Sequence, residues 1–342
     1  MTKESQEDID NLLLEKICKL YSTAVDDLNF LTAIDNNFVY EFQKDCKEYI
    51  LRGGTRHSSD QVKAEIEWIL FLNTQGVKVS LPFLSKNNNY LELVEHGGKV
   101  NNAIVFEKAP GKEIDYRNSK EWNTDIWEEM GRTLGRMHTA AVKYNSEKPE
   151  PKRKTAFESI HTSSSDNILD PLKDSKIIKR FNELKNKLSQ LPQEKDAFGL
   201  IQYDFHTSNF NIDDGVIIVY DFDDSYYFFF IYDLAACIHE TVWAISDERK
   251  LWLANNFIPS LWNGYCEEYK LDRKWLKYLP EFLKWREFII YITIIETLND
   301  ETTPKRYIPE YKEYAAEFKA RTESDEQIVP IPENLEEWFK YF

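Results

Sequence analysis

Residues 198–236 read FGLIQYDFHTSNFNIDDGVIIVYDFDDSYYFFFIYDLAA, and this stretch decides the prediction of the fold. Its first six residues form an apolar run of strand length, and a polar loop follows. Two short apolar runs then surround Asp213-Asp214-Gly215, a sequence that is typical of the tight turn in a β-hairpin. The sequence therefore predicts a strand, a polar loop and a β-hairpin in succession.

This hairpin would gather three polar side chains at one of its ends. Asp204 and Asn209 lie in the loop before the hairpin, and Asp221 follows its return strand. Phosphoryl transfer needs a carboxylate that orients the acceptor hydroxyl and takes its proton, and it needs oxygen ligands that hold Mg²⁺ against the nucleotide phosphates. Carboxylate and amide oxygens suit this hard cation. Each residue alone is typical of a turn, but the combination favours Asp204 as a base and the other two as metal ligands.

The order of these residues resembles the catalytic loop of the aminoglycoside phosphotransferase and choline kinase superfamily. In that loop His-Gly-Asp-x-His-x-x-Asn precedes a strand, which Asp-Phe or Asp-Trp then follows. The resemblance implies that Asp204 is the catalytic aspartate and that Asn209 and Asp221 bind the metal. It also implies supporting roles for His206 and for Asp233, which lies in a Tyr-Asp-Leu-Ala sequence.

One departure from the family pattern precedes the catalytic aspartate. Gln202 and Tyr203 stand where the family has His-Gly, and we expect Gln202 to form hydrogen bonds in place of the histidine. The segment after Tyr232 also resembles bacterial proteins that carry the label homoserine kinase type II. Fold does not establish a substrate, so the acceptor stays open at this point.

The first part of the chain matches the nucleotide-binding lobe that this resemblance implies. Arg52 ends an extended run, where the family places its phosphate-binding cation, and Glu65 matches the glutamate that pairs with it. As an alternative, each could be a solvated surface charge. The loop with Asn36 and Asn37 would cover the phosphates. The residues expected to offer main-chain groups to adenine are Glu107 and Ala109.

Local patterns divide the chain into a strand-rich part and a helical part. Before Pro110 they predict helical spacing at about 9–25, two β-hairpins and a helix that Ser58 opens with a capping box and Gly76 ends. Later apolar periodicity predicts helices at 127–144, 177–191, 238–244, 250–269 and 275–298, with a surface loop at 145–170. We therefore predict an α+β, bilobal protein-kinase-like fold. Its nucleotide-binding lobe would span 1–108, and its catalytic and acceptor-binding lobe 109–342.

A group of acidic and aromatic residues in the second lobe could bind the acceptor. Carboxylates would neutralise an ammonium group, and aromatic faces could add about 0.5–2 kcal/mol each through cation–π contacts. This chemistry favours an amino alcohol, an aminoglycoside or a similar cationic substrate, although aromatic residues in such a pattern can equally be core. The residues are Asp223, Asp224, Glu240, Tyr226, Trp243 and Trp285.

The composition limits the class of partner. The formal net charge of −16 argues against nucleic acid or an anionic membrane as the main partner. The four cysteines form no CxxC pair, so they predict reduced thiols. The acidic, polar start of the chain lacks the features of a signal peptide, and the most apolar run is too short to span a bilayer. We expect a cytoplasmic protein.

The sequence therefore predicts an enzyme that uses ATP or GTP with Mg²⁺. It would transfer the γ-phosphoryl group to a hydroxyl of a small, amine-bearing molecule of the aminoglycoside, choline, ethanolamine or homoserine type. Two alternatives stay open: a Ser/Thr protein kinase of the same fold, and a pseudokinase that serves as a scaffold or binding module. The sequence makes no prediction of the oligomeric state.

Overall fold

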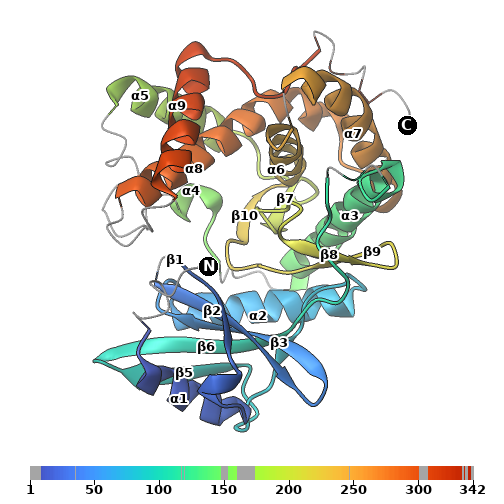
Figure 1. The fold of residues 1–342 in the computed structure, drawn as a ribbon. Coiled ribbons are helices and arrows are strands. Elements are labelled where there is room, and N and C mark those ends of the chain that lie inside the picture. The colour runs from blue at the N-terminus through green and yellow to red at the C-terminus, as the bar shows by residue number, and fades with distance from the viewer. Residues whose placement is uncertain are drawn as a thin grey trace. The chain divides into compact units, whose positions relative to one another are not determined.

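The computed structural model describes residues 9–34, 36–116, 118, 120–147, 153–159, 174–245, 247–299, 307–332, 335 and 338–339. The chain divides into two compact units (Figure 1). Unit 1 contains Met1–Lys112 together with Asn211–Asp213 and Ile218–Asp223, and unit 2 contains the remainder. The strands of unit 1 and the many helices of unit 2 confirm the predicted α+β class.

Unit 1 is built on one antiparallel sheet of six strands in the order β1-β2-β3-β6-β4, with β5 paired to β6. The strands are β1 (Asn29–Ile34), β2 (Asn37–Lys44), β3 (Lys47–Gly54), β4 (Pro82–Phe83), β5 (Leu91–His96) and β6 (Lys99–Glu107). Its helices are α1 (Asn11–Tyr21), the short 3₁₀ helix η2 (Val25–Asp27) and α2 (Ser59–Thr74).

Both predicted hairpins of unit 1 are confirmed, and their turns explain their register. Asp45 and Cys46 link β2 to β3 with φ values of 50° and 60°, and Gly97 and Gly98 link β5 to β6 with φ values of 58° and 75°. Two consecutive residues with positive φ form the turn whose twist matches that of the flanking strands. Each hairpin therefore closes with a two-residue loop.

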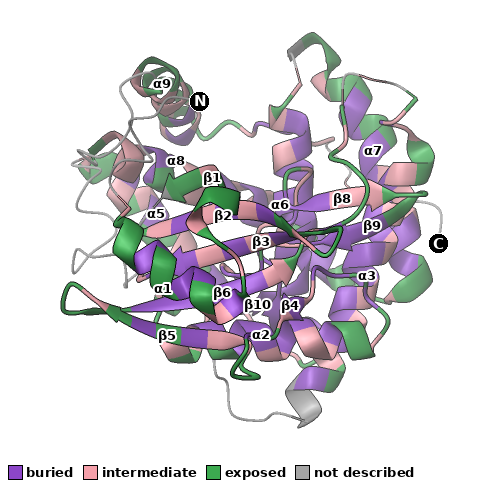
Figure 2. Cartoon of the chain, turned by 60° about the horizontal axis from the view of Figure 1, so that its bottom comes forward, coloured by how far each residue is buried: buried purple, intermediate pink, exposed green. Residues whose placement is uncertain are grey.

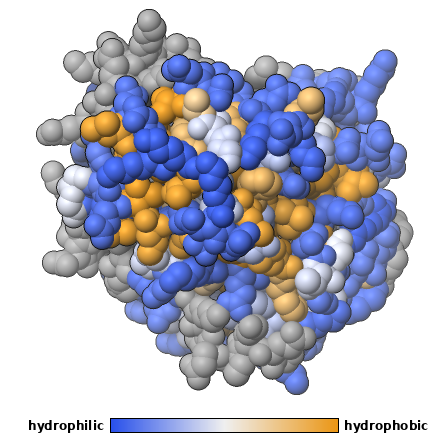
Figure 3. All heavy atoms as spheres, turned by 90° about the horizontal axis from the view of Figure 1, so that it is seen from below, coloured by the Kyte–Doolittle hydropathy of each residue, from blue (hydrophilic) through white to orange (hydrophobic). Residues whose placement is uncertain are grey.

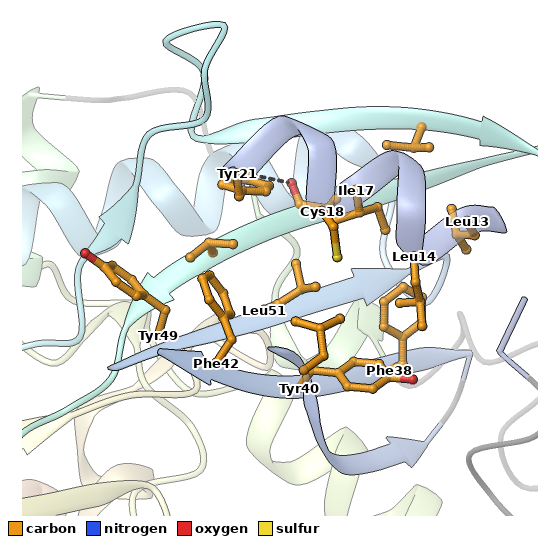
Figure 4. Close-up of a cluster of buried hydrophobic side chains, with 14 residues drawn as sticks. Leu13, Leu14, Ile17, Cys18, Tyr21, Phe38, Tyr40, Phe42, Tyr49 and Leu51 are labelled. Carbon is orange, nitrogen blue, oxygen red and sulfur yellow. Dashed lines mark hydrogen bonds between the residues drawn. The ribbon is translucent and has the colours of Figure 1, made fainter. Parts of the chain in front are cut away.

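The core of unit 1 lies between α1 and the sheet (Figure 4). Leu14 and Ile17 on α1 point toward the sheet, and alternate residues of β2 point back at them, among them Phe38, Tyr40 and Phe42. Burying a side chain of this size contributes about 1.5–3 kcal/mol to stability. The period of two along β2 is the pattern that predicted this strand.

Helix α2 begins and ends where its capping residues predict. The Ser58 hydroxyl accepts a hydrogen bond from the Gln61 amide, and the Gln61 side chain accepts one from the Ser58 amide. This reciprocal capping box satisfies two amide groups that the first turn of a helix leaves unpaired. Gly76 follows the helix with φ 85°, a conformation that glycine adopts without steric cost. Val62 and Ile66 pack with Ile104 of β6.

Unit 2 is mainly helical and contains one short antiparallel strand pair, while the residues of a second pair are divided between units 1 and 2 (Figure 1). The helices are α3 (Thr124–Glu147), α4 (Ala156–Ser159), α5 (Ser175–Ser189), α6 (Phe230–Trp243), α7 (Asp247–Glu268), the 3₁₀ helix η4 (Arg273–Tyr278), α8 (Leu279–Asn299) and α9 (Ile308–Ser324). The strands are β7 (Phe198–Ile201), paired with β10 (Tyr226–Phe229), and β8 (Phe210–Asp213), paired with β9 (Val216–Val219).

The predicted β8–β9 hairpin is present, and its tip has the expected geometry. Asp214 and Gly215 have φ values of 47° and 79°. Part of this hairpin belongs to unit 1, where Ile212 bridges Lys112 and Val219 bridges Val79. The sequence alone does not predict these long-range bridges, because no local pattern records which distant strand a short apolar run will meet.

Three elements of unit 2 differ from their predictions. Helix α6 begins at Phe230, eight residues before the predicted start at 238. Twelve of its fourteen residues are buried, so the helix shows no polar face from which a period of 3.6 could be recognised (Figure 2). Strand β10 and helix α9 were not predicted. The predicted surface loop at 145–170 lies largely outside the described residues and overlaps α3 and α4 at its described parts.

Helices α3 and α7 approach each other closely at glycines. A Cβ added at Gly131 would lie 2.0 Å from the Leu261 carbonyl oxygen, and one at Gly264 would lie 1.9 Å from the Glu128 carbonyl oxygen. Only residues without a side chain fit at these crossings. This contact fixes α3, which carries His138 toward the catalytic loop described below.

The surface carries scattered apolar residues. Figure 3 shows one face, on which apolar side chains form broken strips among hydrophilic ones. Large exposed hydrophobic residues include Leu12, Leu93 and Trp252. No helix among the described residues is long and apolar enough to cross a membrane. All four cysteines are free thiols.

Candidate active site

The loop between β7 and β8 carries the predicted catalytic residues, and Asp233 of α6 holds it in place. The Oδ1 atom of Asp233 accepts a hydrogen bond of 2.8 Å from the Tyr203 amide, and Oδ2 accepts one of 3.3 Å from the Gln202 amide. Oδ2 also lies 3.2 Å from Nε2 of His138, whose Nδ1 lies 2.8 Å from the Tyr265 hydroxyl. Asp233 and His138 are fully buried, so these contacts anchor the start of the loop to two helices.

Gln202 forms the hydrogen bond that was expected of it. Its Oε1 atom accepts from the Asp204 amide at 2.6 Å. Tyr203 stands at the glycine position of the family motif and has φ 72°. A side chain in this left-handed region costs about 1–2 kcal/mol. The Tyr203 ring offsets this cost by stacking on Tyr232 at 4.4 Å, and its hydroxyl accepts a hydrogen bond from Trp285 Nε1 at 3.1 Å.

The Asp204 carboxylate has partners on both of its oxygens. Asn209 Nδ2 donates to Oδ2 at 3.1 Å and to the Asp204 carbonyl oxygen at 2.8 Å, and His206 Nε2 lies 3.3 Å from Oδ2. Arg286 Nη2 donates to Oδ1 at 2.5 Å. Burial alone would raise the pKa of Asp204, but Arg286 and His206 outweigh it and hold the pKa below its usual range. Asp204 is therefore ionised at neutral pH.

The hydrogen bonds from Asn209 to Asp204 orient the side-chain amide of Asn209. Because its nitrogen faces Asp204, its oxygen is the atom that could bind a metal ion. The other predicted ligand, Asp221, follows β9 and belongs to unit 1, with φ 61°. Non-glycine residues in this conformation are uncommon and often mark functional positions. The pairing of Asn209 with Asp221 at one metal ion stays a prediction.

Arg286 is a functional candidate that the sequence analysis missed. It lies on α8 and is 7% exposed. Its Nε and Nη2 atoms contact Oε1 of Glu240 at 2.9 and 2.8 Å, while Nη2 also contacts Asp204. Burial would raise the pKa of Glu240, but Arg286 and His239 lower it to about 2. The signal in the sequence was a charged pair, Arg286-Glu287, next to apolar residues on both sides within the predicted helix at 275–298.

Further buried charged residues lie next to Glu240. His239 is fully buried, with Nε2 2.7 Å from Oε2 of Glu287 and Nδ1 3.7 Å from Oε1 of Glu240. Arg321 of α9 donates to Oε1 of Glu287 at 2.6 Å. Burial alone would lower the pKa of His239, but Glu240 and Glu287 raise it above its ordinary value. The charges of α6, α8 and α9 thus form one continuous network that ends at Asp204.

His239 should make the stability of unit 2 depend on pH. Its folded pKa is raised above the unfolded value of about 6.5, so its stabilising effect is full below that pH and is lost as the pH rises through the folded value. We expect His239→Gln to lower the thermal unfolding temperature most in acidic buffer. The unfolding temperature of this variant should also fall less than that of the wild type as the pH rises. Thermal unfolding followed across this pH range measures both; parallel curves for the two proteins would contradict the prediction.

Unit 1 contains the predicted cation pair. Arg52 Nη2 lies 2.6 Å from Oε2 of Glu65, which confirms the pairing, and Glu65 is 1% exposed. Asp223 also belongs to unit 1 and lies 2.8 Å from Arg56 and 3.5 Å from His57. Burial would lower the pKa of Arg52, but Glu65 and Asp223 raise it. Arg52 therefore stays charged, as binding of a phosphate requires.

The two loops assigned to the nucleotide have different environments. Asn36 has φ 60°, a positive value that asparagine tolerates better than most residues. Its carbonyl oxygen accepts a hydrogen bond from the Thr55 amide. Asn37 opens β2, and the neighbouring Asp35 lies outside the described residues. In the expected hinge, the Glu107 amide donates to Leu81 at 2.8 Å and the Ala109 carbonyl accepts from the Asn211 side chain at 2.9 Å. The nucleotide roles stay predictions.

The residues predicted for the acceptor pocket have different surroundings, and their role stays a prediction. Glu240 is linked to Asp204 through Arg286, which contacts both carboxylates. The ring of Tyr226 packs against Tyr203 at a centroid distance of 5.0 Å, and its hydroxyl donates to Asp224 at 3.2 Å. Trp285 is fully buried and stacks on Phe181, while Trp243 packs on Tyr314 and Phe318 of α9. The charge of Asp223 is balanced by the cations of unit 1.

Comparison with known proteins identifies the family of this chain. Residues 32–277 match the model of the phosphotransferase enzyme family. The amicoumacin kinase of Bacillus subtilis (strain 168) is 31% identical over 322 residues, which cover 93% of each protein. An amicoumacin kinase solved in complex with AMP-PNP, Ca²⁺ and Ami has a TM-score of 0.83 at 29% identity, with 100% of both chains covered.

A structure of a microcompartment-associated aminopropanol kinase shares the fold. Its TM-score is 0.70 at 19% identity, with 92% of this chain and 97% of that chain covered. These findings confirm the predicted superfamily, enzyme class and use of ATP with a divalent metal. The chain belongs to the phosphotransferase enzyme family, as an ATP-dependent kinase that acts on a hydroxyl group.

Proposed function

We propose that this kinase transfers the γ-phosphoryl group of ATP to a hydroxyl of a small amine-bearing molecule, with Asp204 as the base. The observation that carries the proposal is the arrangement around Asp204. Its carboxylate is oriented by Asn209 on one oxygen and by Arg286 on the other. A base held in a fixed direction can meet the acceptor hydroxyl without a costly rearrangement.

Asn209 and Asp221 would hold the Mg²⁺ that accompanies the nucleotide. Both offer the hard oxygen donors that this ion prefers, and the contact of the Asn209 nitrogen with Asp204 turns its oxygen away from the base. When bound, the metal neutralises charge on the phosphates. Arg52 would bind the phosphates and Glu65 would position Arg52, in agreement with their ion pair.

The substrates of similar kinases support an amine on the acceptor. The structures that share this fold include an aminopropanol kinase and an ethanolamine kinase. The similarity to amicoumacin kinases over nearly the whole chain makes amicoumacin the first acceptor to test.

The acceptor is tested by ADP release from MgATP in the presence of one candidate at a time. The panel contains amicoumacin, spectinomycin, 1-amino-2-propanol, ethanolamine, choline and homoserine, with casein as a protein acceptor. We expect a small amine-bearing molecule to raise ADP release above the rate without acceptor. Stimulation by casein alone would favour a protein kinase, and absence of ATP turnover with every acceptor would favour a scaffold.

Replacing Asp221 by alanine tests the metal assignment. We expect wild-type protein to bind AMP-PNP more tightly when Mg²⁺ is present, and Asp221→Ala to lose this difference because a carboxylate ligand is gone. Calorimetric titration with and without Mg²⁺ measures the effect. Asp213→Ala is the matched control, since Asp213 is an exposed carboxylate in the same hairpin. An unchanged Mg²⁺ effect in Asp221→Ala would rule out this ligand.

A further inference from the structure

Arg286 lies where it can orient the proposed base. Its Nη2 atom donates to Oδ1 of Asp204 at 2.5 Å, while Oδ2 of the same carboxylate faces Asn209 and His206. A carboxylate with a partner on each oxygen cannot rotate about its terminal bond without breaking one contact. The direction of the Asp204 oxygens therefore depends on Arg286 as well as on the catalytic loop.

Glu240 fixes the position of Arg286. Two nitrogens of the guanidinium contact the same Glu240 oxygen, at 2.8 and 2.9 Å, and the arginine is 7% exposed. The guanidinium is planar and rigid, so its attachment to Glu240 also fixes the direction in which Nη2 faces Asp204. A lysine has one nitrogen on a flexible stem and could not hold both carboxylates in this geometry.

We propose that Arg286 is a positioning residue for the phosphoryl transfer reaction: anchored by Glu240, it holds the Asp204 carboxylate in the orientation that meets the acceptor hydroxyl. The inference rests on the proposed role of Asp204 as the base. Arg286 also separates two carboxylates that would otherwise repel each other across the gap that it fills. Glu240 is then the anchor of Arg286, in addition to any contact that it makes with an acceptor.

The kinetic test compares Arg286→Met with Lys284→Met. Both changes replace a long cation on α8 by the same apolar side chain, but Lys284 pairs with Asp325 near the surface. The readouts are ADP release from MgATP, with water and with amicoumacin as acceptors, and binding of MgAMP-PNP. We expect Arg286→Met to lower kcat about 100-fold, Lys284→Met to leave it near wild type, and both to bind the nucleotide normally.

Rescue distinguishes positioning from a general structural role. We expect Arg286→Lys to retain more activity than Arg286→Met, and added guanidinium or ethylguanidinium at low millimolar concentration to raise kcat of Arg286→Ala but not that of Lys284→Ala. A smaller side chain leaves room for the free cation at the two carboxylates. Equal kcat in Arg286→Met and wild type would overturn the proposal, as would a loss that neither lysine nor guanidinium relieves.

A stability cycle tests the contact without any need for turnover. Thermal unfolding temperatures are compared for wild type, Asp204→Asn, Arg286→Met and the double variant. If Arg286 holds Asp204 in solution, the double variant should lose less than the sum of the two single shifts. Additive shifts would overturn the proposal even if the acceptor panel succeeds. If the shifts are not additive but no acceptor in the panel is phosphorylated, Arg286 is paired with Asp204 in solution and the proposed function is refuted.

Discussion

Replacing Asp204 by asparagine is expected to lower kcat by about 100- to 10,000-fold, the usual contribution of a general base. Asparagine keeps the size of the side chain and can still contact the catalytic loop, but it cannot accept the acceptor's proton. We expect binding of MgAMP-PNP to change little, because the expected nucleotide contacts lie in other residues. Coupled measurement of ADP release with the best panel acceptor, together with calorimetric nucleotide titration, separates the two effects.

Asp213→Asn provides the control for this experiment. It is the same chemical change at an exposed carboxylate in the hairpin that follows the catalytic loop. Normal turnover is expected there. If Asp204→Asn retained full kcat, another group would have to take the proton, and the assignment of the base would be wrong.

Replacing Asp233 by alanine should have the largest effect on stability. The side chain is fully buried and satisfies the amides of Gln202 and Tyr203 while it faces His138. Its removal leaves these buried groups without their acceptor, and losses of this kind cost about 3–5 kcal/mol. We expect both the free energy of unfolding and the activity to fall, because the loop that carries Asp204 loses its attachment to α6.

Urea unfolding of Asp233→Ala and Asp272→Ala measures this difference. Asp272 caps the exposed start of η4 by accepting a hydrogen bond from the Lys274 amide, so the loss of its side chain should cost about 0.5–2 kcal/mol. Asp233→Ala should unfold at a clearly lower urea concentration than this control. Identical midpoints for the two variants would show that Asp233 does not carry the loop.

The local features of the site could be predicted because short patterns encode them. The turn at Asp214 and Gly215, the capping box at Ser58 and the hydrogen bond of Gln202 each depend on residues within a few positions of one another. The pairing of Arg52 with Glu65 followed from the family resemblance, since a strand and a helix with these charges recur in kinase-like folds.

Long-range contacts could not be predicted in the same way. Arg286 lies 82 positions from Asp204, and no local pattern connects the two. Helix α6 is buried on nearly all sides, so its start could not be recognised from amphipathic spacing. Trp285 was a candidate for an acceptor pocket, yet its ring packs on Phe181 and its nitrogen bonds to Tyr203. Burial of this kind depends on the tertiary fold.

We expect the phosphoryl group to move from ATP to a hydroxyl of a small molecule at Asp204. Mass spectrometry of amicoumacin after incubation with MgATP tests this most directly, with wild type and Asp204→Asn run in parallel. We predict that wild-type protein adds one phosphoryl group to the small molecule and that Asp204→Asn adds none in the same time. Phosphate found only on the protein itself, or equal product from the two proteins, would contradict the account.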